Sequence, residues 1–350
     1  MSEKKNVTIY DIAREAGVSP ATVSRILTGS ASVRQEKRER VNELISKYQF
    51  RPNAMARALS ETHTRLIGMV SADVGNSYYH SLFTACTNAA RQRGYSLLLF
   101  NTMSRAELEN AAIARLMELR VDAIIIAGGR VDLAQPDEAF LGELRSTVGR
   151  VPVVVASRSP LAEVPGVAVD HAGSMDIALR HLISLGHREI GFVYTGRQFY
   201  GTVEKLLRFR AVLAEYGLPV REEWMLEVPD YDIESGRLGA DRLLRLPEKP
   251  TAVLGLNDMI SIGLLKQLTD RGVRVPEQLS LLSFDDTYIT SLTTPGICSV
   301  DYDYAQYAAH LTDAAIACAE GRSVPRQQLV APSLSLKGSC GAPSGRKDRV

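Results

Sequence analysis

Long hydrophobic runs and an apolar leader are both missing from this sequence. No stretch approaches the ~18–20 apolar residues that a membrane span needs, and the polar start MSEKKNVTIYD lacks the apolar segment of a secretory signal. Cysteine is scarce, and the spacing of these residues indicates neither a metal site nor a paired set: Cys86, Cys298, Cys318 and Cys340. We therefore expect free thiols, no bound metal, no membrane partner and a cytoplasmic protein.

Motifs of cofactor-binding and catalytic sites are missing too. The chain has no G-x-G-x-x-G after a predicted strand, no G-x-x-x-x-G-K-[ST], no H-E-x-x-H and no G-x-S-x-G. Its six histidines are scattered, and His187 is expected to be structural. We therefore expect no catalytic residues, no cofactor and no enzymatic activity. Two alternatives stay open: an enzyme on an α/β fold, and a transport-type solute-binding protein, which would need a signal peptide and have no basic head.

Charge is distributed unevenly along the 350 residues, whose net charge is only +1. Residues 1–65 hold 12 Lys and Arg against 7 Asp and Glu, a net of +5, so the remaining residues carry −4. A basic segment joined to a mildly acidic remainder is typical of a nucleic-acid-binding domain attached to another domain. The length also suits two or three folded units.

Residues 1–50 have the pattern of a small helix-turn-helix domain. Apolar side chains recur there at intervals of three and four residues, which predicts an amphipathic helix that ends at Gly17. A second helix is predicted to begin at Ser19 and Pro20, because serine is a good N-cap and proline a good first helical residue. A third amphipathic helix around residues 41–48 closes the small core.

Residues 51–65 are predicted to form a hinge helix and linker. Pro52 disfavours helix at Arg51, and Asn53 can cap the short apolar stripe that follows. That stripe spans about seven residues, whereas isolated helices below ~12–15 residues are marginal in water. The hinge helix should therefore need a partner in order to form.

The rest of the chain, to residue 337, alternates apolar runs of strand length with helical segments. The predicted strands are residues 66–71, 96–100, 123–127, 153–156, 166–169, 190–194, 252–256 and 279–284. The predicted helices between them include residues 79–93, 107–119, 175–185 and 261–271. Continuous apolar strands separated by helices predict an α/β body with parallel sheets covered on both faces, long enough for two lobes. Its ligands should bind beyond the carboxyl ends of the strands.

The segment V-T-I-Y-D-I-A-R-E-A-G-V-S-P-A-T-V-S-R-I-L resembles the N-terminal signature of the lactose repressor family, and Y-Q-F-R-P-N-A-M-A-R-A-L resembles its hinge. V-A-V-D-H-A-G-S, H-L-I-S-L-G-H-R-E-I-G-F, L-N-D-M-I-S-I-G and V-P-E-Q-L-S-L-L-S-F-D-D resemble blocks of the same family. The resemblance implies a sequence-specific DNA-binding transcriptional regulator, by default a repressor. It also implies a two-lobed body like that of periplasmic binding proteins, with a small-molecule effector between the lobes. Lobe 1 would comprise about residues 66–163 and 302–327, and lobe 2 about residues 164–300 and 328–337.

The resemblance assigns contacts with double-stranded operator DNA to both the head and the hinge. These residues are Thr8, Ser19, Pro20, Ala21, Thr22, Ser24, Arg25, Asn53, Ala56 and Leu59. Arg25 falls on the family's base-contacting arginine, and an arginine can chelate guanine O6 and N7. The hydroxyl-bearing residues would contact phosphates, which position the protein without specifying sequence. Leu59 falls on the leucine that wedges into the minor groove.

Effector contacts are implied for residues in loops that follow the predicted strands. They are Asn76, Tyr78, Tyr79, Ser157, Arg158, Lys205, Tyr231, Asn257, Asp285 and Tyr302. Three of these depart from the family pattern: Lys205 replaces an arginine, Ser157 replaces an acidic residue, and Tyr302 stands where glutamine is common. Because one carboxylate is lost while Lys205 and Arg158 remain, we expect a sugar acid or sugar phosphate in preference to a neutral sugar.

Two copies of the chain are expected to act together, because two half-sites on DNA require two heads. Some family members form tetramers through a leucine-rich C-terminal helix, but the end here, KGSCGAPSGRKDRV, contains no leucine. We therefore predict a homodimer and a disordered basic tail over residues 338–350.

Overall fold

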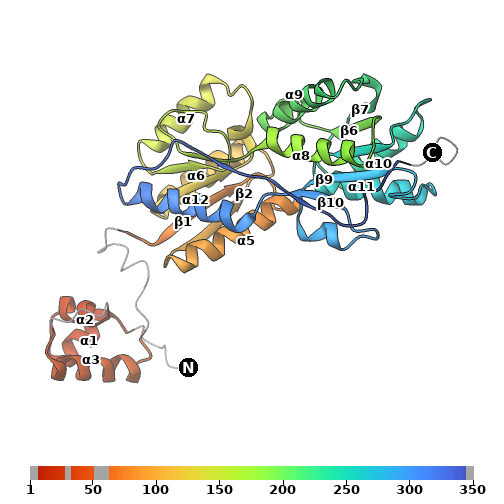
Figure 1. Ribbon diagram of the computed structural model, residues 1–350. Helices are drawn as coiled ribbons and strands as arrows, with labels where there is room; N and C mark the ends of the chain where they lie inside the picture. The colour runs from red at the N-terminus through yellow and green to blue at the C-terminus, as the bar shows by residue number, and fades with distance from the viewer. Residues whose placement is uncertain (1–6, 28–32, 51–62, 344–350) are drawn as a thin grey trace. The chain divides into compact units, whose positions relative to one another are not determined.

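The computed structural model describes residues 7–27, 33–50 and 63–343. The chain divides into two compact units, a head up to residue 64 and a body from residue 65 (Figure 1). Each unit is considered by itself below.

The head consists of short helices around a small apolar core. Its described helices are α1 (Ile9–Ala16), α2 (Pro20–Leu27) and α3 (Gln35–Lys47). Ile12 of α1, Val23 of α2 and Val41 of α3 have no exposed surface and belong to one apolar cluster, which packs the three helices together. Between α1 and α2, Gly17 adopts a left-handed conformation (φ 66°, ψ 37°) that ends the first helix and is open to glycine without steric strain. The predicted helix-turn-helix head is confirmed.

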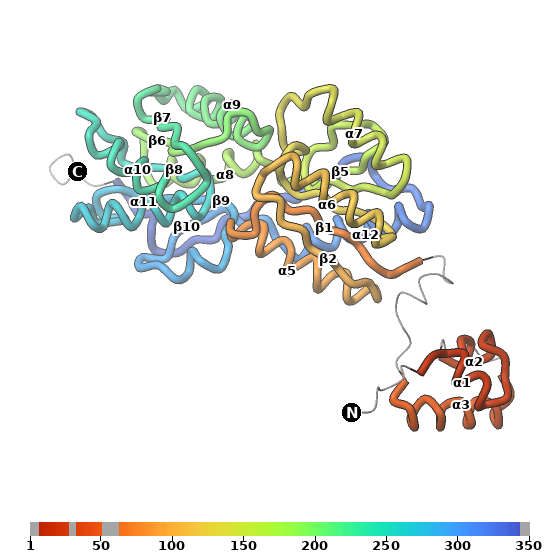
Figure 2. The backbone as a smooth tube through the Cα atoms, turned by 180° about the vertical axis from the view of Figure 1, so that it is seen from behind, coloured from red at the N-terminus to blue at the C-terminus, as the bar shows by residue number. Residues whose placement is uncertain are grey.

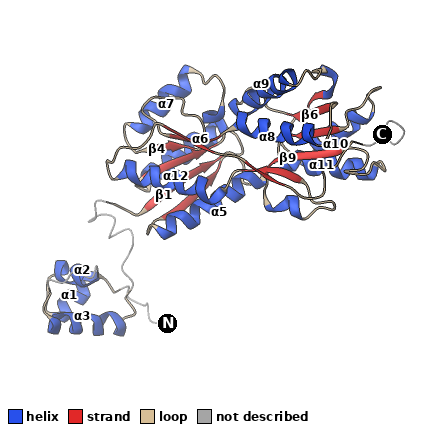
Figure 3. Cartoon of the chain, in the orientation of Figure 1, coloured by secondary structure: helices blue, strands red, loops and turns tan. Residues whose placement is uncertain are grey.

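The body contains two six-stranded sheets flanked by helices (Figure 3). In spatial order, the first sheet is β11 (Gln327–Val330), β5 (Gly166–Val169), β4 (Val153–Val155), β3 (Ala123–Ala127), β1 (Leu66–Ser71) and β2 (Ser96–Asn101). The second sheet is β12 (Ser333–Ser335), β10 (Cys298–Asp301), β9 (Ser280–Asp285), β8 (Ala252–Gly255), β6 (Ile190–Tyr194) and β7 (Met225–Glu227). The strand pairs are parallel, except that β12 runs antiparallel to β10. The predicted two-lobed α/β fold with parallel sheets is confirmed.

Helices cover both sheets, and one late helix closes the first lobe. The α-helices of the body are α5 (Ser77–Gln92), α6 (Ala106–Glu118), α7 (Glu138–Val148), α8 (His171–Ser184), α9 (Tyr200–Glu215), α10 (Ile233–Leu244), α11 (Asp258–Asp270) and α12 (Tyr304–Ala319). The 3-10 helices are η1 (Gly129–Asp132), η2 (Glu222–Trp224) and η3 (Tyr288–Ser291). Although α12 is far from α5 in sequence, the two helices pack side by side, as both views show (Figures 1 and 2).

The chain passes between the lobes three times, and two of these crossings differ from the prediction. The first was expected near residue 164, but β5 belongs to the first sheet because it pairs with β4 and β11. The chain therefore leaves lobe 1 only after Val169. The third crossing follows Val330 at the end of β11, not residue 328. The middle crossing, between Asp301 and Tyr304, lies where it was predicted.

The segment after β12 also differs from the prediction of a disordered tail from residue 338. Residues 338–343 pack against the second lobe, where Leu281 N donates to Ser339 O at 2.8 Å and Ser339 is fully buried. His187 extends this contact, because its Nε2 lies 2.9 Å from Gly341 O and its Nδ1 lies 2.9 Å from Thr251 Oγ1. These bonds give the segment a fixed place on the lobe. Residues 344–350 lie outside the described part of the chain.

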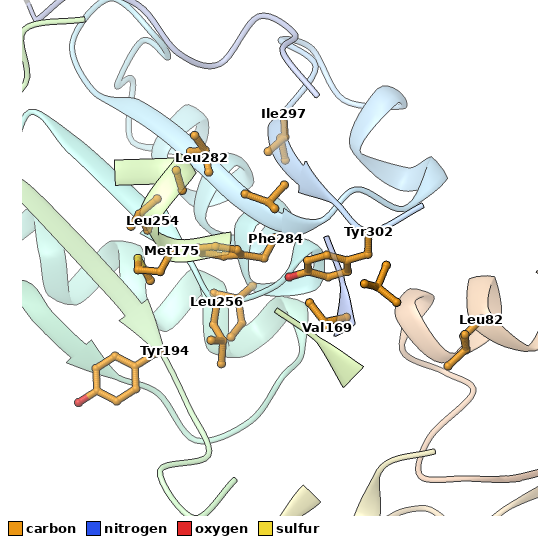
Figure 4. Close-up of a cluster of buried hydrophobic side chains, with 14 of the residues drawn as sticks. Leu82, Val169, Met175, Tyr194, Leu254, Leu256, Leu282, Phe284, Ile297 and Tyr302 are labelled. Atoms are coloured by element: carbon orange, nitrogen blue, oxygen red, sulfur yellow. The ribbon is translucent and has the colours of Figure 1, made fainter. Parts of the chain in front are cut away.

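A continuous apolar core runs from the first lobe into the second. Close to the cleft it includes Val169 from β5 and Met175 from α8, together with Leu256 and Phe284, which follow or end strands of the second sheet (Figure 4). Burying such side chains stabilises the fold by roughly 1.5–3 kcal/mol each, so the strand ends that carry the cleft residues are held firmly. None of the described helices combines the length and the hydrophobicity needed to cross a bilayer.

Candidate functional site

Helix α2 presents one polar face to solvent and one apolar face to the head. Val23 and Ile26 are buried, whereas Ala21 and Arg25 are exposed on the other side. This division follows from the helical repeat, which places residues three and four apart on the same face. Ala21 and Arg25, two of the predicted DNA contacts, thus lie on the solvent-exposed face of α2.

Two predicted phosphate contacts already have structural roles in the head. Thr8 forms a capping box: its hydroxyl donates to Asp11 Oδ2 at 2.7 Å and accepts from Asp11 N at 3.3 Å. Ser19 accepts from Thr22 N at 3.2 Å, and the hydroxyls of Ser19 and Thr22 are 2.9 Å apart. A phosphate contact would have to share these hydroxyls with the helix caps, so it stays a prediction.

The remaining predicted DNA contacts fall partly inside and partly outside the described residues. Pro20 and Ser24 lie on α2 and are partly exposed. Asn53, Ala56 and Leu59 lie outside the described residues.

A cavity of about 420 Å³ lies in the body and is lined from both lobes, a volume within the usual range for small-molecule sites. The predicted effector residues that line it are Asn76, Tyr78, Tyr79, Ser157, Lys205, Tyr231, Asn257, Asp285 and Tyr302. They come together because the carboxyl ends of the parallel strands of both sheets meet at this cleft. Contact of each residue with a ligand stays a prediction.

Arg158 is the predicted effector residue that does not line this cleft. It lies in a neighbouring cavity, where its guanidinium is 5.2 Å from the ring centre of Tyr200. Ser157 lines the cleft, whereas Arg158, the next residue in the bend after β4, lines the neighbouring cavity. Contact of Arg158 with an effector stays a prediction.

Asp132 is a cleft residue that the sequence analysis missed. It ends η1, directly after β3, and its carboxyl accepts a hydrogen bond from Ser157. Burial raises its pKa to about 6, while the bond from Ser157 opposes that rise. The cleft thus keeps a carboxyl beside Ser157, although the expected acidic residue is absent. The strand-end rule applied to β3 could have found Asp132.

Lys205 and Asp285 form the charged centre of the cleft. Lys205 is 5% exposed, and its Nζ lies 4.2 Å from the ring centre of Phe284. Burial lowers the pKa of Lys205 to about 8, partly offset by Asp285 and Asp258. Burial also raises the pKa of Asp285 to about 7, and neighbouring Asp258 adds to the rise. At neutral pH, the Lys205 ammonium therefore lies near the Asp285 carboxyl, whose pKa is close to that pH.

Tyrosines from both lobes form the apolar and hydrogen-bonding walls of the cleft. Tyr78 Oη donates to Tyr307 Oη at 3.3 Å, and Tyr307 Oη donates to Ala156 O at 3.0 Å. Across the cleft, Tyr231 packs beside Phe199 with ring centres 6.2 Å apart. Such rings can stack on the apolar face of a ligand while their hydroxyls bind its polar edge.

Each lobe seats one cleft tyrosine directly against a glycine. A Cβ at Gly128 would lie 2.2 Å from the Tyr79 hydroxyl, and a Cβ at Gly196 would lie 2.1 Å from the Tyr231 hydroxyl. Both glycines also have positive φ, which side-chain-bearing residues rarely adopt. These glycines make room for the tyrosines at the two walls.

Two predicted effector residues also serve as helix caps. Asn76 Oδ1 accepts from Tyr78 N at 3.0 Å at the start of α5, and Asn257 Oδ1 accepts from Ile260 N at 2.9 Å at the start of α11. Asn257 Nδ2 further donates to the carbonyl of Tyr231. Both amide oxygens thus serve helix caps, and contact of either amide with a ligand stays a prediction.

The complete set of groups suits a small polar molecule with several hydroxyls. Carboxyls accept its hydrogen bonds, Lys205 and the tyrosines donate to it, and the aromatic rings cover its apolar surface. His171 also lines the cleft and is neutral, because burial and the nearby Lys205 lower its pKa to about 3. Among the described lining residues, Lys205 is the one ammonium donor and the carboxyls outnumber it, which favours a neutral ligand over an anion.

Known protein families match parts of both the head and the body. Residues 8–53 match the family model of bacterial regulatory proteins, lacI family, and residues 179–340 match that of a periplasmic binding protein-like domain. Catabolite control protein A of Priestia megaterium is 34% identical over 297 residues, which cover 84% of this chain and 87% of that protein. The HTH-type transcriptional regulator AscG of Escherichia coli (strain K12) is 31% identical over 343 residues, which cover 96% of this chain and 99% of that protein.

Solved structures show the same fold along nearly the whole chain. The Lac repressor bound to ONPG in the repressed state has a TM-score of 0.84 at 25% identity, covering 96% of this chain and 100% of that one. The Lac repressor dimer bound to operator and the anti-inducer ONPF also has a TM-score of 0.84, at 24% identity, covering 97% of this chain and 100% of that one.

Proposed function

The chain belongs to the lacI family of bacterial DNA-binding transcription regulators, and we propose that it is a repressor controlled by a sugar-sized, polyhydroxylated effector bound in the cleft. The observation that carries this proposal is the cleft itself. Asp132, Lys205 and Asp285 meet there with tyrosines from both lobes, at the place where the chain crosses between them.

On the DNA side, α2 enters the major groove. Its exposed face carries Arg25, whose guanidinium can pair with both acceptors of a guanine. Thr8, Ser19, Thr22 and Ser24 hold the head on phosphates, and the hinge residues Asn53, Ala56 and Leu59 contact the minor groove. Two copies of the chain bind together as a homodimer, so the operator consists of two related half-sites.

On the ligand side, the effector sets the angle between the lobes. Because both lobes contribute to the cleft, a ligand can favour one lobe arrangement only through contacts that differ between arrangements. That preference reaches the DNA through the two hinges, since each hinge helix needs its partner in order to form. A coupling of about 1–3 kcal/mol would change operator affinity roughly 5–150-fold.

Binding-site selection from random DNA, followed by a matched pair of variants, tests the DNA half of the proposal. We expect selection to yield a two-half-site sequence. Arg25→Ala should reduce discrimination between this sequence and scrambled DNA by roughly 5–150-fold, because one bidentate base contact contributes about 1–3 kcal/mol. Arg40→Ala removes the same charge from an exposed position of α3, so it should weaken binding to both DNAs equally. Equal effects of the two variants on discrimination would contradict the assignment of Arg25.

A thermal-shift screen tests the ligand half. Neutral sugars, polyols, sugar acids and sugar phosphates are compared at concentrations well above micromolar, where a specific ligand raises the melting temperature by mass action. We expect neutral polyhydroxylated compounds to stabilise the protein, and the hit to change the affinity for the selected DNA. Recovery of the ligand unchanged after prolonged incubation would support binding without turnover. Stabilisation by sugar acids or phosphates alone would contradict the proposed ligand class.

A further inference from the structure

Two of the four cysteines lie in contact, although they are distant in sequence. Cys298 is in β10 and is buried, whereas Cys340 lies in the segment after β12 and is partly exposed. The two thiols are in hydrogen-bond contact. The spacing of cysteines along the chain gave no indication of this pair.

The backbone holds both thiols in place. Cys298 N donates to Ser339 Oγ at 2.8 Å, and Leu281 N donates to Ser339 O at 2.8 Å. Cys340 Sγ itself lies 3.2 Å from the Leu281 carbonyl oxygen. The contact between the sulfurs is thus part of an ordered attachment of the C-terminal segment to β9 and β10.

The surroundings of Cys298 favour its thiolate. Lys337 N donates to Cys298 Sγ at 3.1 Å, and Ser339 contributes a further hydrogen bond. The hydrogen bond with Cys340, followed by these bonds, lowers the pKa of Cys298 to about 5 despite its burial. The same contact, together with burial, raises the pKa of Cys340. Cys298 is therefore the nucleophile, and Cys340 keeps its hydrogen, which it donates to the Leu281 carbonyl oxygen.

The other two cysteines lack this arrangement and serve as internal references. Burial raises the pKa of Cys86 to about 12, and burial also raises the pKa of Cys318. Thiols of that kind react slowly with oxidants, because the thiolate is the reacting form.

We propose that Cys298 and Cys340 form an oxidation-sensitive dithiol, which a hydroperoxide converts into an intramolecular disulfide. The Cys298 thiolate attacks one peroxide oxygen, the O–O bond breaks, and hydrogen peroxide leaves a sulfenic acid on Cys298 and hydroxide. The Cys340 thiol then attacks the sulfenic sulfur, an S–S bond forms, and the displaced hydroxyl leaves with the thiol proton as water. A small thiol reductant reverses the step by thiol–disulfide exchange.

The position of the pair connects this chemistry with the cleft. Lys337, whose N–H bonds Cys298, forms an ion pair through its side chain with Asp286. Asp286 directly follows Asp285, the cleft carboxyl. A disulfide takes away the thiolate that Lys337 N bonds and ties the segment covalently to β10, so the oxidised protein differs from the reduced one next to the ligand site.

Peptide mapping of the purified full chain after exposure to hydrogen peroxide tests the proposal. We expect loss of two of the four thiols, a mass decrease of about 2 Da that a reductant reverses, and a cross-linked peptide containing Cys298 and Cys340. Neither Cys86 nor Cys318 should appear in the cross-linked peptide. Sulfinic or sulfonic acid on Cys298 without the cross-link, cross-links between chains only, or a cross-link through Cys86 or Cys318 would overturn the proposal.

Two variants separate the steps. Cys340→Ser should stop the reaction at the sulfenic acid, which dimedone traps on Cys298, whereas Cys318→Ser should leave the cross-link unchanged. Formation of the normal two-thiol loss in Cys340→Ser would overturn the assignment of Cys340. If Cys340→Ser does not fold, the peptide map of the unaltered chain still decides the question.

Discussion

Truncation of Ile12 should unfold the head without disturbing the body. Ile12 has no exposed surface and packs in a core made only of head residues. Ile12→Ala removes buried carbons and leaves a cavity, which costs about 2–5 kcal/mol, whereas Ile12→Val costs about 0.5–1.5 kcal/mol. A unit of this size has only about 3–5 kcal/mol from its core, so the alanine variant should lose most of that stability.

Hydrogen exchange read by mass spectrometry on the full chain measures this effect directly. Peptides from α1, α2 and α3 should exchange at least ~30-fold faster in Ile12→Ala, because 1.4 kcal/mol corresponds to a factor of ten in the opening equilibrium. In Ile12→Val the same peptides should exchange roughly 2–12-fold faster. The exchange rates of peptides from β6 and β8 should be unchanged. Affinity for the selected operator should fall slightly in Ile12→Val and further in Ile12→Ala. Faster exchange throughout the body, or a head that stays fully protected in Ile12→Ala, would refute the separation into two independent units.

Three further predictions concern the body. Gly128→Ala should weaken ligand binding, measured by calorimetry, at least ~10-fold, because the new Cβ lies 2.2 Å from a cleft tyrosine hydroxyl. Gly217 also has a positive φ, but no atom lies within 4 Å of the position of its Cβ. Gly217→Ala should therefore cost about 1 kcal/mol of stability and leave the ligand affinity unchanged. Ligand affinity should be highest between pH about 7 and about 8, because Asp285 gains a proton below that window and Lys205 loses one above it. Lys205→Met should remove the decline in affinity at alkaline pH. A ligand affinity of the unaltered chain that does not change with pH would be evidence against a role for Asp285 and Lys205. Ser339→Ala should lower the free energy of unfolding by about 1–3 kcal/mol, since a buried N–H loses its acceptor; an unchanged denaturation midpoint would argue against the ordered C-terminal segment.

The fold could be predicted from the sequence wherever periodicity was long and regular. The capped helix ended by Gly17 and the five-residue apolar run of β3 both form as expected, because local preference and tertiary packing agree there. Short strands were harder. Strands β7 and β12 span three residues each and do not stand in a longer apolar run like that of β4, so only their pairing with neighbouring strands defines them.

The cleft was predictable to the extent that strand ends converge. That rule located Asp285, but it could not tell that Ser157 and Arg158 would line two neighbouring cavities. Asp132 lies in η1 beyond the end of β3, where the strand-end rule points, but its hydrogen bond from Ser157 follows only from the tertiary structure. The contact between Cys298 and Cys340 has the same character: it exists only because the segment after β12 returns across β9 and β10.

The discontinuous construction of the lobes has a consequence for synthesis on the ribosome. The head consists of neighbouring helices and can fold as soon as it emerges, whereas each sheet waits for a strand from the end of the chain, β11 for one and β12 for the other. A nascent chain stalled before Cys298 would carry a finished head on two lobes that still expose apolar surface, and such surface attracts chaperones or aggregates. Production of intact protein should therefore be governed by how quickly the last strands are added.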